Sequence, residues 1–305
     1  MKNWLKSMFI IAGIAGMALP GFSQGKDGAW EIVGLGGITC FDSDLGGKGP
    51  NKTDYLGTAQ YSFGIGARYI LNNYISIRPT FIYGNYYADD ALSDDAGRRQ
   101  RNLNVKSYVA DLSVNVEFSL VNWQQTYSRG GRSFTNGTNI YAFSGFGMFF
   151  FNPTGEIGGS WYELQPLGTE GQGVPGSNKS RYALNSFGIP VGVGLRQKLN
   201  NGFSLGLEFN YRKTFTDYMD DVSTTYYNNA AIAAANGELA AALADKTLNG
   251  SIRPSGSARG NPKVNDAFFF VQLTLSKRLG EKGRGAGYGG RRGGFRSNNS
   301  CPSFR

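Results

Sequence analysis

Apolar and polar residues alternate along several segments of the chain, most regularly between Ser107 and Leu120. Every second residue from Tyr108 to Leu120 is apolar, and the residues between them are polar except for Val109. A period of two is the signature of a β-strand whose two faces meet different surroundings. The segment therefore predicts a strand with one face toward lipid or a second sheet and a polar face on the other side.

Seven further segments show the same alternation with varying clarity. The eight predicted strands span residues 29–41, 60–70, 74–87, 107–120, 139–151, 186–197, 203–214 and 266–277. Many short alternating segments, together with frequent Gly, Tyr and Phe, are typical of a transmembrane barrel with a crowded interior. We predict an all-β fold: an eight-stranded antiparallel up-and-down transmembrane β-barrel with long extracellular loops.

Short and long connections alternate between the predicted strands. Residues 71–74 and 199–202 form tight turns that contain Asn, a residue that tolerates left-handed backbone. The long polar connections lie near residues 42–59, 88–104, 152–182 and 216–262. Outer-membrane barrels have short periplasmic turns and long outer loops, so we expect both ends of the chain in the periplasm.

Two connections have features of their own. Residues 121–138 are expected to form a periplasmic turn, yet they are long, and Arg129 and Arg132 make them basic. Residues 228–246, in the last outer loop, are rich in Ala and other strong helix formers. We expect a short helix there, at the mouth of the barrel.

The first residues have the three regions of a cleaved secretory signal peptide. Lys2 and Lys6 are followed by an apolar run from Met8 to Leu19 and by small residues before Gln24. The run is too short for a spanning helix, which needs roughly 20 apolar residues. We expect a signal peptide over residues 1–23, a barrel over 24–280, a basic tail over 281–305, and an outer-membrane location.

Several predicted strands carry charged residues on their polar faces. In a barrel these residues point inward: Arg68, Arg78, Asp111, Glu117, Arg196, Glu208 and Arg212. Such a set either passes ions or forms mutually paired side chains. Eight strands enclose only enough room for their own side chains, and buried charges persist when they are paired. We therefore predict a closed barrel filled by a charge network.

The composition argues against catalysis, because the chain contains no His. His is the usual general base near neutral pH, so the Ser-His and Cys-His arrangements and most zinc sites are excluded. No segment has the ligand spacing of a calcium loop, and we expect the acids of the outer loops to be solvated. We predict no enzyme activity, cofactor or metal. The acids are Asp42, Asp44, Asp89, Asp90, Asp94, Asp95, Asp217, Asp220 and Asp221.

The two cysteines, Cys40 and Cys301, lie in the first predicted strand and in the tail. A disulfide is compatible with the periplasm, but the sequence does not bring the two residues together. Two unpaired thiols are the favoured interpretation, with a disulfide as the alternative.

Most of the net charge of +9 lies at the C-terminus. From Lys277 onward, eight basic residues face one acid, Glu281. An exported protein meets little nucleic acid, so the tail is either a disordered solubilising end or a docking arm for an acidic periplasmic partner. In the second case the contact residues are expected among Arg129, Arg132, Lys282, Arg284, Arg291, Arg292 and Arg296.

Three runs of residues resemble the PorG-type outer-membrane barrels of the Bacteroidota. They are AWEIVGLGGI from Ala29, WYELQPLGTEGQG from Trp161 and YRKTFTDYMDD from Tyr211. The resemblance covers most of residues 29–279, and the run at Trp161 is its most specific part because barrel physics does not demand it. It implies a component of the type IX secretion and gliding machinery that associates with the periplasmic ring of PorK and PorN. It supplies no catalytic residues. The alternative function is a stand-alone surface barrel of the OmpX or OmpA kind, with a ligand-binding or structural role.

Overall fold

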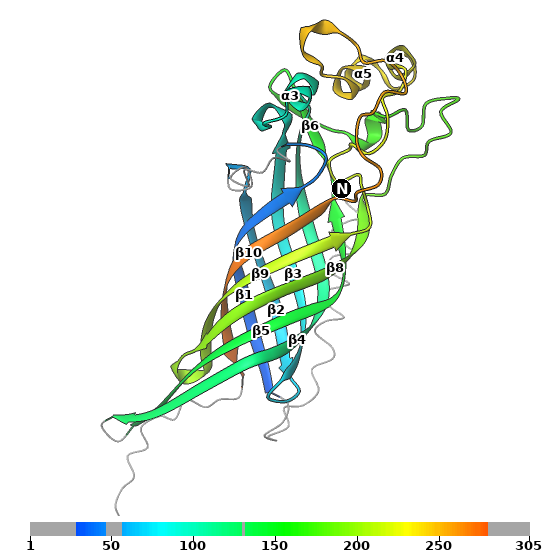
Figure 1. Ribbon diagram of the computed structural model, residues 1–305. Coiled ribbons are helices and arrows are strands. Elements are labelled where there is room, and N and C mark those ends of the chain that lie inside the picture. The colour runs from blue at the N-terminus through cyan, green and yellow to red at the C-terminus, as the bar shows by residue number, and fades with distance from the viewer. Residues whose placement is uncertain (1–28, 47–56, 130–131, 280–305) are drawn as a thin grey trace, which may run out of the picture.

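The computed structural model describes residues 29–46, 57–129 and 132–279 of the chain (Figure 1). Strands β1 to β5 pair in chain order, β8 pairs with β5, and β10 pairs with β1. The sheet therefore closes into the predicted eight-stranded antiparallel barrel. Its strands are β1 (Ala29–Asp42), β2 (Gln60–Ile70), β3 (Ile75–Asp89), β4 (Asn104–Arg129), β5 (Arg132–Phe151), β8 (Asn185–Lys198), β9 (Phe203–Thr214) and β10 (Ala267–Arg278).

Both predicted tight turns are confirmed. The amide of Leu71 donates to Ile75 O at 3.1 Å, and that of Leu199 donates to Phe203 O at 2.8 Å. The backbone of Asn201 is left-handed, with φ of 60°. The short turns therefore lie at the end of the barrel where β1 begins and β10 ends, which is the periplasmic end by the rule for such barrels.

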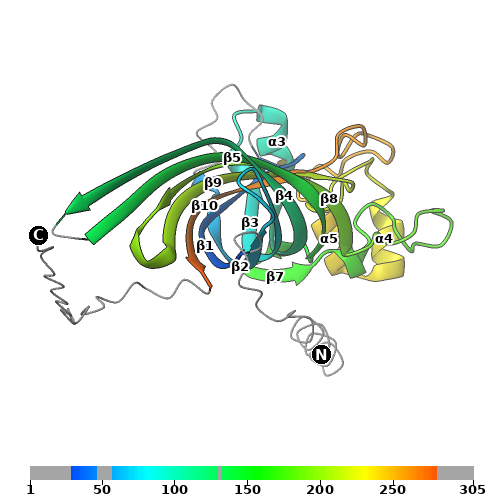
Figure 2. The same cartoon turned by 90° about the horizontal axis from the view of Figure 1, so that it is seen from below.

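The expected turn over residues 121–138 is wrong, because these residues continue the two strands. β4 pairs with β3 only up to Phe118, and β5 pairs with β8 only from Gly137 onward. Beyond these points β4 and β5 go on pairing with each other as far as Arg129 and Arg132. We call residues 120–129 and 132–136 the projecting hairpin. It extends past the other strands at the periplasmic end (Figures 1 and 2).

Apolar side chains cover the outside of the barrel. Every strand places such residues on its outer face, where they are exposed although they are large. Examples are Ile32, Phe63, Phe81, Val114, Phe146, Val193, Leu207 and Leu273. An apolar outer face combined with buried polar residues inside is the arrangement that lipid imposes on a transmembrane barrel.

The interior has two layers, whereas the alternation predicts polar residues throughout. The layer toward the long loops is apolar and aromatic, with Tyr86, Val109, Phe149 and Phe268 fully buried. Val109, the exception in the β4 pattern, belongs to this layer. The layer toward the periplasm is polar and charged.

The long loops fold into a cap over the mouth of the barrel. Leu45, Leu103, Met219, Val222 and Leu243 come from these loops and pack in one cluster with the upper interior layer. The cap also contains a small hairpin of β6 (Thr154–Ile157) and β7 (Ser160–Glu163), which the polar sequence of its loop did not predict. Its short helical segments include η1 (Asp90–Leu92), α3 (Ala96–Arg101), η2 (Gln165–Leu167) and η4 (Leu248–Gly250).

The Ala-rich stretch is helical, as predicted, but it is divided in two. α4 (Asn229–Asn236) and α5 (Glu238–Ala244) are separated by Gly237, whose φ of 92° no helical residue adopts. Ile232 and Ala240 are buried where the two helices pack. No helix in the described part of the chain has the length and apolar character needed to cross a membrane.

Candidate functional site

Glu117 lies at the centre of the charged layer inside the barrel. Its carboxylate is 2.7 Å from Arg68 Nε and 2.8 Å from Arg78 Nε. All three side chains are almost fully buried. Arg68 also reaches Glu31 at 2.7 Å, and Arg78 reaches Glu208 at 2.6 Å. These residues come from β1, β2, β3, β4 and β9, so one chain of ion pairs crosses the interior.

Two further arginines are buried inside the barrel. Arg212 forms a bidentate pair with Asp111, at 2.8 and 2.9 Å. Arg196 receives support from the amide oxygen of Asn139 at 3.0 Å and lies over the ring of Tyr141 at 4.9 Å. The Tyr141 hydroxyl in turn donates to Glu208. Bidentate, charge-assisted contacts such as that of Arg212 with Asp111 are the strongest hydrogen bonds available to buried charges.

The structure buries all seven sequence-selected charges inside the barrel and adds Glu31. Asp111 is opposite Phe149 and Arg212 is opposite Phe268 in the strand registers, so this pair borders the aromatic layer. The sequence did not predict Glu31 because the alternation in the first strand is weak. The available signal was its spacing of two and four residues from Val33 and Leu35, which are buried on the same face of the strand. The described barrel strands bury four arginines and four acids, so their formal charges balance. An eight-stranded barrel has room only for its own side chains, and a balanced, mutually paired set is the form in which charges can be buried there.

Glycines on β8 give the interior aromatic rings their room. A Cβ at Gly194 would lie 2.4 Å from Tyr141 Cζ, and one at Gly192 would lie 2.3 Å from Phe143 Cζ. The rings thus lie directly against the backbone of the neighbouring strand. This packing occupies the space beside the ion pairs.

A second set of buried ion pairs holds the cap together. Arg259 is 3.3 Å from Glu170 and 3.5 Å from Asp221. Arg101 pairs with Asp90 at 2.6 Å. Glu170 also accepts from Ser223 N at 2.9 Å. Arg101 also donates to Arg259 O at 2.5 Å. These contacts join the loops after β3, β5 and β9 into one folded unit.

Five of the nine loop acids are buried, so the expectation of solvated carboxylates is wrong for them: Asp44, Asp90, Asp217, Asp220 and Asp221. Asp90 and Asp221 lie in the ion pairs described above. Burial raises the pKa of Asp221 to about 6, against the lowering effect of Arg259. The sequence could not reveal this because loops far apart in the chain supply the partners.

The carboxyl group of Asp220 lies in the interior of the cap. Its oxygens accept from Val222 N at 2.9 Å and Leu45 N at 3.3 Å. Burial raises the pKa of Asp220 to about 8, with further contributions from the carboxylates of Asp44 and Asp217. Burial and the charge of Asp220 likewise raise the pKa of Asp266. No group of acids, cysteines or histidines in the described part of the chain is arranged to hold a metal ion.

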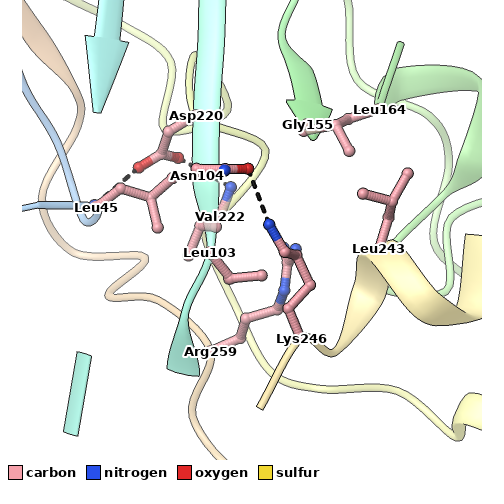
Figure 3. Close-up of a pocket in the computed structure, with 10 residues that line it drawn as sticks. All are labelled: Leu45, Leu103, Asn104, Gly155, Leu164, Asp220, Val222, Leu243, Lys246 and Arg259. Carbon is pink, nitrogen blue, oxygen red and sulfur yellow. Dashed lines mark hydrogen bonds between the residues drawn. The ribbon is translucent and has the colours of Figure 1, made fainter. Parts of the chain in front are cut away.

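The pocket beside this acid is small (Figure 3). Leu45, Leu103, Leu243 and Arg259 contribute to its walls, and Lys246 Nζ donates to Asn104 Oδ1 at 3.0 Å. The centre of a water molecule could occupy about 10 Å³ inside this pocket. That is roughly the room that a single water needs. Small-molecule sites are far larger, at several hundred Å³.

The residues selected as partner contacts divide into two groups. Arg129 and Arg132 are the last paired positions of the projecting hairpin. Lys282, Arg284, Arg291, Arg292 and Arg296 lie outside the described residues, as do the predicted signal peptide over residues 1–23 and Cys301. Cys40 is buried in β1.

Comparison with known proteins gives one family match and several similar folds. A family described as "Domain of unknown function (DUF6089)" matches residues 31–155. No curated protein matches the sequence. The crystal structure of Ail from Yersinia pestis, in complex with the heparin analogue sucrose octasulfate, aligns with a TM-score of 0.38 and 10% identity, covering 83% of this chain and 99% of that one.

Two other barrels give similar values. Neisserial surface protein A (NspA) aligns with a TM-score of 0.34 and 10% identity, covering 81% of this chain and 96% of its own. A major outer membrane protein from Thermus thermophilus aligns with a TM-score of 0.36 and 12% identity, covering 82% and 100%. Values this low say nothing about a shared ligand or partner.

Replacing Glu117 with Gln should destabilise the barrel strongly. The amide keeps the size of the side chain but leaves Arg68 and Arg78 without their shared charge, a loss of about 3–5 kcal/mol for a buried pair. Urea unfolding of the protein refolded into lipid vesicles measures this loss. Lys106→Gln, on the exposed face of the same strand, is the matched control and should cost less than about 1 kcal/mol. Equal effects of the two substitutions would contradict the network.

The cap should lose stability as the pH rises. The pKa of Asp220 is raised above its ordinary value in the folded cap, so the folded state retains a proton that the unfolded state releases between about pH 4 and 8. The stabilisation is therefore complete below that range and is lost as the pH rises through it. Amide hydrogen exchange at Val222 and Leu45 reports the opening of the cap.

Asp220→Asn removes this titrating group and should reduce the pH dependence of the opening free energy, which is obtained by comparing each exchange rate with the intrinsic rate of a free amide at the same pH. Asp221 and Asp266, whose pKa values are also raised, account for the part that remains. Asp94→Asn, at an exposed cap position, is the control and should leave the dependence unchanged. The assignment to Asp220 fails if the Asp220→Asn variant shows the same dependence as the wild type.

Proposed function

We propose that the protein is a barrel component of the type IX protein secretion and gliding machinery in the outer membrane. In this role it anchors, or associates with, a periplasmic ring built from PorK-like and PorN-like proteins. The observation that carries the proposal is the projecting hairpin, which continues β4 and β5 away from the barrel at the periplasmic end. The hairpin extends beyond the last pairing of β4 with β3 and of β5 with β8, so its two edges are not covered by the neighbouring strands of the barrel.

The closed interior supports the same role. A paired charge network and an aromatic layer fill the barrel, and the cap covers its mouth. A function in transport through the barrel is therefore disfavoured, and the surfaces at its two ends remain. At the periplasmic end, the short turns at residues 71–74 and 199–202 offer little surface compared with the projecting hairpin.

Contacts within the cap support the resemblance to PorG-type barrels. Thr169, in the run from Trp161, donates to Asp221, in the run from Tyr211. Glu170 of the first run accepts from Ser223 and Thr224, directly after the second run. The run from Trp161 and the loop part of the run from Tyr211 are thus in contact and belong to one structure in the cap. Because this structure is on the extracellular side, it supports the resemblance and does not supply the contacts to a ring.

A second candidate function is that of a stand-alone surface barrel that binds a partner through its cap. The observation in its favour is the exposure of large apolar and aromatic residues there, including Trp161, Tyr162 and Ile252. The pocket in the cap is too small for a ligand, so such a partner would be a macromolecule that covers a flat surface.

A pull-down in mild detergent tests the proposal. The tagged wild-type protein should recover ring lipoproteins, and a strain without the protein should secrete poorly. A version with residues 281–305 removed should recover less of the ring if the basic tail is a docking arm. Trp161→Ala, which alters only the cap, is the control and should recover the ring as the wild type does. Absence of ring proteins from the wild-type sample, together with normal secretion in the deletion strain, would refute the role.

A further inference from the structure

We infer that the outer edge of β4 in the projecting hairpin is a docking strand for an extended acidic segment of a periplasmic protein. The inference deepens the proposed function and rests on it for the existence of a periplasmic partner. The partner would add a strand to the hairpin, so that its backbone pairs with residues 120–129 and its acidic side chains lie near the tip.

The edge of β4 is open over a long stretch. Its last contact with β3 is the hydrogen bond from Ser119 N to Tyr74 O, at 2.7 Å. From there to Arg129, no strand in the described part of the chain pairs with this side of β4. Ten residues of strand extend about 33 Å at the usual rise per residue. A row of unpaired N–H and C=O groups of this length is a template for strand addition.

A bulge separates this edge from the barrel wall. The register between β4 and β5 shifts between Ser119 and Val121, so that Leu120 is an extra residue. Bulges bend a strand, increase its twist and are frequent where pairing ends. The bulge therefore coincides with the point at which β4 leaves β3 and its edge becomes open.

The open edge lacks the usual protection against pairing. Proteins guard exposed edges with Lys, Pro or inward charges. Residues 120–128 contain no charged residue and no Pro, and they include Val121, Trp123, Thr126 and Tyr127, all of which favour strands. A free edge of this composition indicates that a partner strand covers it.

The charges of the hairpin indicate an acidic partner. The backbone register pairs Arg129 with Arg132, so both chain positions next to the tip are basic residues. Such cross-strand pairs are unfavourable unless an opposite charge lies close by. The sequence from 121 to 138 contains no acid that could serve. An acidic segment aligned with β4 would supply that charge.

The same reasoning disfavours two other candidates for pairing with the edge of β4, namely the tail of the chain and a second copy of the protein. The tail of the chain carries a large excess of positive charge from Lys277 onward and is rich in Gly, which strands disfavour. A second copy of the hairpin would bring Arg129 and Arg132 against identical residues. Either arrangement adds like charges at the tip instead of compensating them.

The backbone pattern identifies the amides that would pair with the partner. In an antiparallel ladder, successive residues direct their N–H groups to opposite sides. Ser119 directs its N–H toward β3, and the extra residue at Leu120 then shifts the pattern by one. The even-numbered residues of the hairpin, among them Gln124 and Thr126, therefore direct their N–H groups outward.

Photo-crosslinking in cells tests the inference on the full-length protein. Benzoylphenylalanine at position 124 should form an adduct with an acidic, extended segment of a periplasmic protein, identified by peptide mapping. Thr126→Pro removes one outward N–H, a change that edge strands tolerate, and should lower the adduct by about tenfold or more. Thr126→Val keeps the N–H and the β-branched shape and should leave the adduct unchanged. Heat-modifiable gel mobility shows that the barrel of each variant is folded.

The outcomes separate this inference from the proposed function. Strand addition is overturned if Thr126→Pro leaves the adduct unchanged, if the adduct lies in the tail, in a second copy or in a non-acidic segment, or if none forms. Ring recovery that survives Thr126→Pro would refute strand addition and leave the ring-anchoring role intact. An acidic segment from a protein outside the ring, lost in Thr126→Pro, would support strand addition and refute that role.

Discussion

Glu117, held between Arg68 and Arg78, is the contact on which the rest of the barrel depends. Removing two guanidinium groups and a carboxylate from water is costly, and only close pairing with further hydrogen bonds makes it tolerable. The neighbouring pairs of Arg68 with Glu31 and of Arg78 with Glu208 extend this pairing across the barrel. The need to pair these buried charges also fixes the register of the strands. A slip of one residue in any strand would turn its charged face to lipid, where an unpaired charge is expensive.

A filled interior determines where the protein can act. The charged layer closes the periplasmic half, the aromatic layer closes the other half, and the cap covers the mouth through its own ion pairs. What remains accessible is the surface of the cap and the projecting hairpin. Buried ion pairs connect the loops of the cap, whereas the hairpin presents an open strand edge. The strand addition that we propose would therefore take place at the periplasmic end.

The period of two along the chain predicted the eight strands well, because lipid outside and polar groups inside act on every residue of a strand. The prediction was weakest at positions where the two faces of a strand do not differ in this way. Val109 breaks the pattern because the upper interior is apolar, and Glu31 was missed because its strand alternates poorly. The projecting hairpin was expected to be a turn, although Val121, Trp123 and Tyr127 continue the alternation of β4, because a connection at the periplasmic end is usually short. The burial of Asp220 and Asp221 depends on loops brought together by the closed barrel, which no local pattern encodes.

Electrical recording tests the central claim, that the barrel is closed and acts through its two ends. Purified protein is inserted into planar lipid bilayers, with folding verified by its heat-modifiable mobility, and single-channel current is recorded in molar salt. The charge network and the aromatic layer predict insertion without steady conductance at any applied voltage. A stable, reproducible open-channel conductance from folded protein would contradict the claim and indicate that the protein acts as a channel.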